Sequence, residues 1–102
     1  MDISEFTTEN MTPLVGTSWR LDAPNGQQYT IELVGVLKTV DKHIDPRFQR
    51  DTFSLQFIGP PDVLFPQATY PLSNDVVGGP HHIFIVPLAR EPRGYRYEAI
   101  FT

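Results

Sequence analysis

The segment FSLQFIGPPDVLFPQATY, from Phe53 to Tyr70, places the strongest constraint on how this chain folds. Its first residues alternate, with Phe53, Leu55 and Phe57 on one side and polar residues on the other. A period of two is typical of a β-strand that turns one face into a core. Gly59-Pro60-Pro61 must end that strand, because proline donates no ladder hydrogen bond. The segment therefore predicts a sheet of strands separated by tight breaks.

The same alternation recurs along the chain and predicts six strands, at about 18–21, 28–36, 53–58, 70–72, 83–86 and 95–101. Pro24-Asn25-Gly26 and Gly94 suit hairpin turns between neighbouring strands. Gly35, inside an apolar run, predicts a β-bulge that bends its strand.

Two of these strands have special patterns. Pro71 predicts that Tyr70–Leu72 is an edge strand, since it cannot donate to a ladder. The run Ile83–Val86 is apolar at every position, which predicts a central strand covered on both faces.

Length and composition complete the prediction of fold class. The chain has 102 residues, ten of them proline and seven glycine, which favours many turns over long helices. We expect one all-β domain over 1–102, a small antiparallel barrel or sandwich of about six to seven short strands. Residues 1–12 form a partly ordered N-terminal segment or short helix, in which Thr7 caps a turn from Thr8 to Met11. The polar stretch 38–51 predicts a long exposed loop.

Charge argues against two classes of partner. The net charge is −4, whereas nucleic acids and anionic membranes require a clustered basic face. No apolar stretch reaches the roughly 18 residues of a membrane span, and the acidic N-terminus does not resemble a secretory signal. The default expectation is a cytoplasmic protein, with a place in an exported or phage-like assembly as the other location.

The sequence contains few of the features that are typical of an enzyme active site. There is no cysteine, no GxSxG motif and no phosphate-binding glycine loop, so we expect neither catalytic residues nor a cofactor. The candidate metal ligands are His43, His81 and His82, which would suit a metal-dependent hydrolase. Adjacent residues on a strand point to opposite faces, so His81 and His82 would bind one ion only from a loop.

Candidate contacts with a ligand or partner lie near the proline-bounded loops. They are Phe65, Gln67, Tyr70, Val76 and Val77. Gln67 is flanked by aromatic residues, and its amide is suited either to pairing the backbone of that loop or to holding a ligand.

The motifs PLVG, SWRL, IELVGV, FSLQFIGP, LFPQATYPL, IFIVPL and YRYEAIF together resemble a family of small uncharacterised bacterial domains. The resemblance runs from Pro13 to Phe101, and His81-His82 departs from the family's pattern. The positions that match the pattern are Phe53, Gly59, Pro60, Pro66, Gln67, Tyr70, Pro87, Tyr97 and Phe101. Members are often encoded near proteins with phage tail-collar domains, including the microcystin-dependent type. The resemblance implies no enzyme activity, and it implies a fibre or tail-collar-type protein as the partner.

Three functions follow as hypotheses. The first is a non-enzymatic structural or protein-interaction module that is accessory to the assembly of a phage-tail-like fibre or collar. The second is a small-ligand domain for a sugar or peptide, because aromatic residues cluster near the loops of a barrel mouth. The third is the metal-dependent hydrolase built on the histidines.

Overall fold

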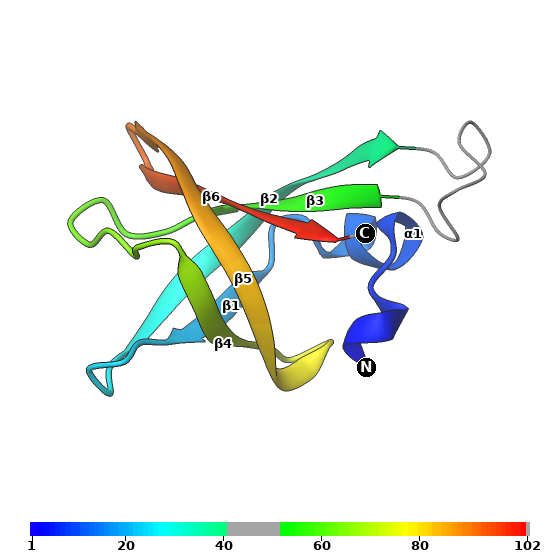
Figure 1. Ribbon diagram of the computed structural model, residues 1–102, viewed down its shortest axis with the longest axis horizontal. Coiled ribbons are helices and arrows are strands. Elements are labelled where there is room, and N and C mark those ends of the chain that lie inside the picture. The colour runs from blue at the N-terminus through cyan, green and yellow to red at the C-terminus, as the bar shows by residue number, and fades with distance from the viewer. Residues whose placement is uncertain (41–51, 102) are drawn as a thin grey trace.

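The computed structural model describes residues 1–40 and 52–101, and in that part of the chain six antiparallel strands close into a barrel (Figure 1). The strands are β1 (Ser18–Asp22), β2 (Gln28–Val40), β3 (Thr52–Ile58), β4 (Ala68–Asn74), β5 (Gly78–Glu91) and β6 (Gly94–Phe101). Their order around the barrel is β1-β2-β3-β6-β5-β4, and β4 pairs with β1 to close the ring. The sequence predicted either a barrel or a sandwich, and the structure is a barrel.

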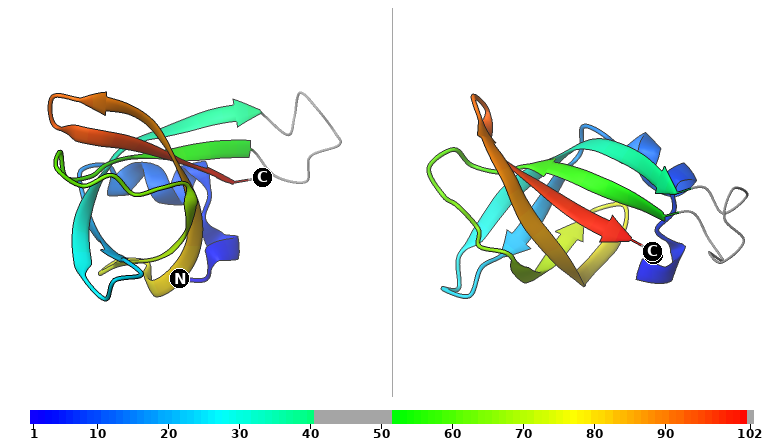
Figure 2. Two further views of the ribbon diagram at one scale, coloured as in Figure 1. Left: turned by 60° about the vertical axis from the view of Figure 1, so that its left-hand side comes forward. Right: turned by 45° about the horizontal axis from the view of Figure 1, so that its top comes forward.

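Two long strands each pair with two different neighbouring strands along their length. The first part of β2 pairs with β1 and its second part with β3, and β5 is shared in the same way between β4 and β6 (Figure 2). The register of β2 shifts between Leu33 and Gly35, which confirms the predicted bulge. Bulges increase the local twist of a strand, which is what a strand shared between two parts of a barrel requires.

Three short helical segments precede the barrel: η1 (Ile3–Glu5), α1 (Thr8–Met11) and η2 (Thr12–Leu14). The side chain of Thr7 accepts a hydrogen bond from the backbone N–H of Asn10, as the predicted cap requires. Phe6 is fully buried, and its ring packs against those of Trp19, His81 and Phe101 at centroid distances of 6.4, 5.2 and 5.7 Å. The N-terminal segment therefore closes the end of the barrel where β1 and β5 begin and β6 ends.

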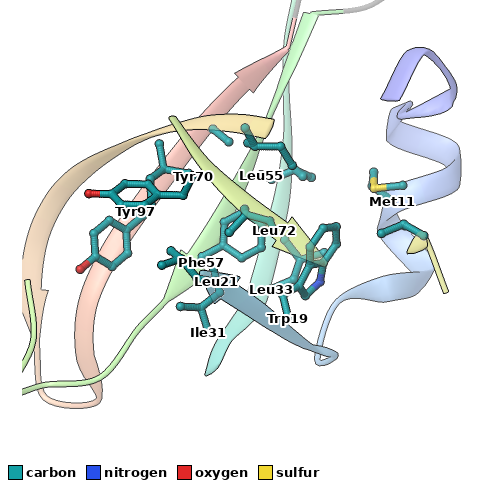
Figure 3. Close-up of a cluster of buried hydrophobic side chains, with 14 of the residues drawn as sticks. Met11, Trp19, Leu21, Ile31, Leu33, Leu55, Phe57, Tyr70, Leu72 and Tyr97 are labelled. Carbon is teal, nitrogen blue, oxygen red and sulfur yellow. The ribbon is translucent and has the colours of Figure 1, made fainter. Parts of the chain in front are cut away.

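The core lies inside the ring and is filled by alternate residues of all six strands. Figure 3 shows these side chains, with Met11 reaching them from the helical segment. The largest fully buried side chains are Trp19, Tyr97, Phe6, Phe53, Phe57, Met11, Leu21, Ile31, Leu33, Leu55, Leu72 and Ile85. The described residues include no helix long and apolar enough to cross a bilayer.

Three of the predictions for individual segments are wrong. Tyr70–Leu72 is not an edge, because β4 lies between β1 and β5 in the closed ring. In the run Ile83–Val86 the side chain of Phe84 is half-exposed while Ile83 and Ile85 are buried, so β5 has a single covered face. The predicted loop 38–51 begins too early, since β2 continues through Val40, and 41–51 lie outside the described residues.

One buried amide connects the two strands that close the barrel. The Asn74 side chain is buried, and its Nδ2 donates to the Ser18 carbonyl at 3.1 Å and to Thr17 Oγ1 at 3.3 Å. Its Oδ1 accepts from the backbone N–H groups of Val76 at 2.7 Å and Val77 at 3.4 Å. Asn74 thus ties the start of β1 to the turn between β4 and β5, with both ends of its amide satisfied.

Replacing this amide should weaken closure of the ring. We expect Asn74→Ala to lower the free energy of unfolding by about 3 kcal/mol, because it leaves several polar groups without a partner. Urea unfolding followed by tryptophan fluorescence measures the change. The matched control is Asn10→Ala, which removes the exposed hydrogen bond from Asn10 Nδ2 to the Glu5 carbonyl and should cost under about 1 kcal/mol. Equal losses in the two variants would contradict the role given to Asn74.

Candidate binding pocket

An apolar pocket of about 460 Å³ opens at the end of the barrel away from the N-terminal segment. One wall is the hairpin between β1 and β2, and the other is the loop 59–67 between β3 and β4, both at the left in Figure 1. The lining residues are Ala23, Pro24, Asn25 and Tyr29 from the hairpin, Val63, Leu64, Phe65 and Pro66 from the loop, and Ala68 and Tyr70 from β4. Pockets of this size and character hold small molecules or the side chains of a peptide.

The hairpin wall follows from its sequence. Pro24-Asn25-Gly26 makes the predicted turn, in which the N–H of Gly26 donates to the Ala23 carbonyl at 3.0 Å. Gly26 has a φ of +85°, a conformation that glycine adopts without strain. Beyond the turn, Tyr29 lines the pocket, and its hydroxyl donates to Gln27 Oε1 at 2.9 Å.

The loop wall is held by tyrosine hydroxyls. The N–H of Phe65 donates to the Tyr97 hydroxyl at 2.9 Å, and this hydrogen bond is buried. The Tyr70 hydroxyl in turn donates to the Pro66 carbonyl at 2.6 Å. Two backbone groups of the loop are thereby satisfied by side chains from the barrel, as a loop that packs on a core requires.

The start of the loop is fixed by close packing of backbone. The N–H of Gly59 donates to the Tyr95 carbonyl at 2.9 Å. Gly94, at a φ of +147°, lies directly against the Gly59 carbonyl, where no Cβ fits. The hairpin between β5 and β6 is thus packed against the loop that forms the pocket.

Phe65 is the centre of an aromatic cluster beneath the pocket. Its ring is buried and lies 5.1 Å from that of Tyr29, 6.0 Å from Tyr70 and 5.6 Å from Tyr97, measured between centroids. Aromatic pairs at these distances stabilise a fixed arrangement beyond what area burial gives. The base of the pocket is therefore a packed cluster of aromatic rings.

Burial affects the acidity of two of these hydroxyls. It raises the pKa of Tyr97 above the ordinary value of 10.0, an effect that the hydrogen bond from Phe65 partly opposes. Burial also raises the pKa of Tyr70. Both hydroxyls are therefore protonated at neutral pH, the state in which Tyr70 can donate to Pro66.

The predicted contact residues divide between the two ends of β4. Phe65 and Tyr70 line the pocket, whereas Gln67 is exposed and lies outside its lining. The loop backbone is paired by Tyr70 and Tyr97 rather than by the amide of Gln67. Val76 and Val77 lie in the turn after β4, where Val76 is exposed and Val77 is buried in the core.

The candidate metal ligands do not assemble in the part of the chain that the structure describes. His43 lies outside the described residues. His81 pairs with the inward-facing Leu72, and its Nε2 lies 2.9 Å from the Val77 carbonyl, while His82 pairs with Pro71 and is exposed. Among the described residues no three His, Cys, Asp or Glu side chains gather at one point.

Several pocket residues were not identified from the sequence. Pro24 is predicted only as part of a turn, and the sequence gives no signal of a binding role for Tyr29 or Leu64. The one usable signal was that the turn 24–26 and the loop 59–67 both combine proline with apolar residues. Nothing in the sequence placed these two segments beside each other.

Residues 6–101 match the model of a family described as a domain of unknown function, DUF6916. The chain belongs to this family. The match begins at Phe6, the first buried residue, so the DUF6916 domain includes α1 and η2 as well as the six strands. Neither a curated protein nor a solved structure shows significant similarity to the chain.

The buried Tyr97 hydroxyl predicts how stability depends on pH. Because its pKa is higher in the native state than in the unfolded chain, its contribution is complete below about pH 10 and is lost as the pH rises further. We expect Tyr97→Phe to be about 1 kcal/mol less stable at neutral pH, since Phe65 loses its acceptor. Above about pH 10 the free energy of unfolding of the variant should fall less steeply than that of the wild type. The difference in stability between the two proteins therefore narrows.

Urea unfolding at about pH 8 and about pH 11 tests this prediction. Tyr29→Phe is the matched control, because it removes a hydroxyl that donates only to the exposed side chain of Gln27. That control should follow the wild type at both pH values. If Tyr97→Phe and the wild type lose the same free energy of unfolding between the two pH values, the prediction is contradicted.

Proposed function

We propose that this DUF6916 domain is a non-enzymatic protein-interaction module whose pocket receives an apolar segment of a partner protein. The observation that supports the proposal best is the pocket of about 460 Å³, lined almost wholly by apolar and aromatic side chains. Burial of such surface is the main favourable term in protein association.

The rim of the pocket exposes apolar side chains to solvent, and burying them against a partner would be favourable. Leu64 is 53% exposed, and Pro24 and Pro66 are exposed beside it. A contiguous apolar patch with a concave centre is characteristic of interaction sites on soluble domains. The patch combines an anchor pocket with a surrounding apolar rim.

The pocket needs little rearrangement to bind. Its floor is fixed by the Phe65 ring cluster, and its loop by the hydrogen bonds to Tyr70 and Tyr97. A preformed site avoids the entropy cost of ordering a loop at the moment of association. This rigidity supports recognition of a defined segment.

The resemblance of the sequence motifs implies the partner: a fibre or tail-collar-type protein encoded near the domain. In this proposal the domain is an accessory to assembly, which binds an apolar segment of the fibre protein. A second candidate function uses the same pocket, because its volume lies within the range of sites for sugars and other small ligands.

A substitution at the rim tests whether the partner binds at the pocket or at another exposed surface. We expect Leu64→Ser to weaken binding of a co-expressed tail-collar-type protein by about tenfold or more, because one buried leucine contributes about 1.5–3 kcal/mol. Affinity co-purification followed by isothermal titration calorimetry measures the loss. Thermal stability should be nearly unchanged, since Leu64 is exposed.

Val76→Ser is the matched control, because Val76 is 59% exposed and lies at the other end of β4. It should bind the partner as the wild type does. Equal weakening in both variants would contradict the assignment to the pocket. A partner that does not co-purify, together with a thermal-shift response to sugars that Leu64→Ser removes, would favour the small-ligand function instead.

A further inference from the structure

We propose that Asn25 is a site of spontaneous covalent modification, at which the side-chain amide becomes a carboxylate in the lining of the pocket. The reacting groups belong to one exposed turn, Pro24-Asn25-Gly26, between β1 and β2. The reaction needs water but no partner protein, so its test is independent of the proposed function.

The two reacting groups are adjacent in the sequence. The backbone nitrogen of Gly26 loses its proton to a hydroxide ion and attacks Cγ of Asn25, and the new N–Cγ bond closes a five-membered succinimide ring. The Cγ–Nδ2 bond breaks, and Nδ2 takes a proton from water and leaves as ammonia. Water then opens the ring at either of its carbonyls. The product is aspartate or isoaspartate at position 25, with one additional negative charge at neutral pH.

Gly26 leaves the attacking nitrogen accessible. Asn25, Gly26 and Gln27 are all exposed. Glycine has no side chain to crowd the ring as it closes. Apart from the adjoining residues of the chain, no atom of the described residues lies within 4 Å of the point where a Cβ on Gly26 would be. Closure of the ring therefore meets no obstacle from the described part of the fold.

One hydrogen bond of the turn favours the reaction. The N–H of Gln27 donates to Asn25 Oδ1 at 3.0 Å. When Cγ is attacked, negative charge develops on this oxygen. A backbone donor that is already in place there stabilises the tetrahedral intermediate, as the donors of an oxyanion hole do.

A second hydrogen bond of the turn slows the reaction. The N–H of Gly26 donates to the Ala23 carbonyl at 3.0 Å, and this bond must open before the nitrogen can attack. Exposed turns open locally at low cost in free energy. Loss of one exposed hydrogen bond slows the reaction by only about fivefold.

The product changes the lining of the pocket. Residue 25 belongs to the hairpin wall, and most of the other lining residues are apolar or aromatic. A carboxylate at this position disfavours burial of the wall against an apolar segment, because a charge loses hydration when it is covered. Isoaspartate also lengthens the backbone of the turn by one methylene group.

The two other asparagines of the chain serve as internal controls. Asn10 is exposed but lies in α1, and Met11 follows it. Asn74 is buried, both ends of its amide are hydrogen-bonded, and Asp75 follows it. A side chain on the following residue hinders closure of the ring at both positions. At Asn74 several buried hydrogen bonds must also break first.

Timed incubation of the folded, full-length protein at mildly alkaline pH measures the reaction. Peptide mapping by mass spectrometry should show aspartate and isoaspartate at position 25. They should form at least about tenfold faster there than at Asn10 or Asn74. Asn25→Gln is the matched variant, because glutamine would have to close a larger ring. It should show no change at position 25 over the same period.

Incubation in urea separates the reactivity of the sequence from that of the folded turn. The rate in the folded protein should lie within about fivefold of the rate in the unfolded chain, since one exposed hydrogen bond must open. If Asn25 reacts only in urea, the folded turn protects it and the proposal is wrong. A rate at Asn25 no higher than at Asn10 and Asn74, or the same mass change in Asn25→Gln, would overturn it as well.

Discussion

The pairing of β4 with β1 is the contact on which the rest of this domain depends. It is short, with Arg20 opposite Ser73 and Leu21 opposite Leu72, yet it turns a curved sheet into a closed ring. Closure encloses the core and leaves these two strands without a free edge. It also places the hairpin after β1 beside the loop before β4, so the same pairing that encloses the core forms the walls of the pocket.

Two buried polar side chains make this arrangement specific. Asn74 connects β1 to the turn after β4 at one end of the barrel, and Tyr97 holds Phe65 at the other. Apolar packing alone tolerates alternative arrangements of similar volume, whereas a buried donor or acceptor must meet its partner. The Tyr97 hydroxyl thus links the packing of the core to the shape of the candidate pocket.

Local patterns predicted local structure well. The Thr7 cap and the Gly35 bulge each depend on a few neighbouring residues, and both are confirmed. Phe53, Leu55 and Phe57 face the core as predicted, but the strand is not half-buried, because Ser54 on its other face is buried too. The errors concern neighbours in space. Pro71 suggested an edge, but a ring has no outermost strand, and Phe84 extended an apolar run although its side chain faces outward. The candidate site was predicted only at Phe65 and Tyr70, because its other wall comes from the hairpin 22–28.

The sequence by itself determined that this chain folds as alternating strands of an all-β architecture, where its tight turns lie, and that it carries a net negative charge. These properties follow from backbone sterics, side-chain periodicity and composition, which act over a few residues. Only the tertiary structure decided that the sheet closes as a barrel, that the Tyr97 hydroxyl holds the loop at Phe65, and that the hairpin after β1 and the loop before β4 line one pocket. Those features join residues 32 or more positions apart in the sequence, and such contacts form only when long-range strand pairing fixes the register.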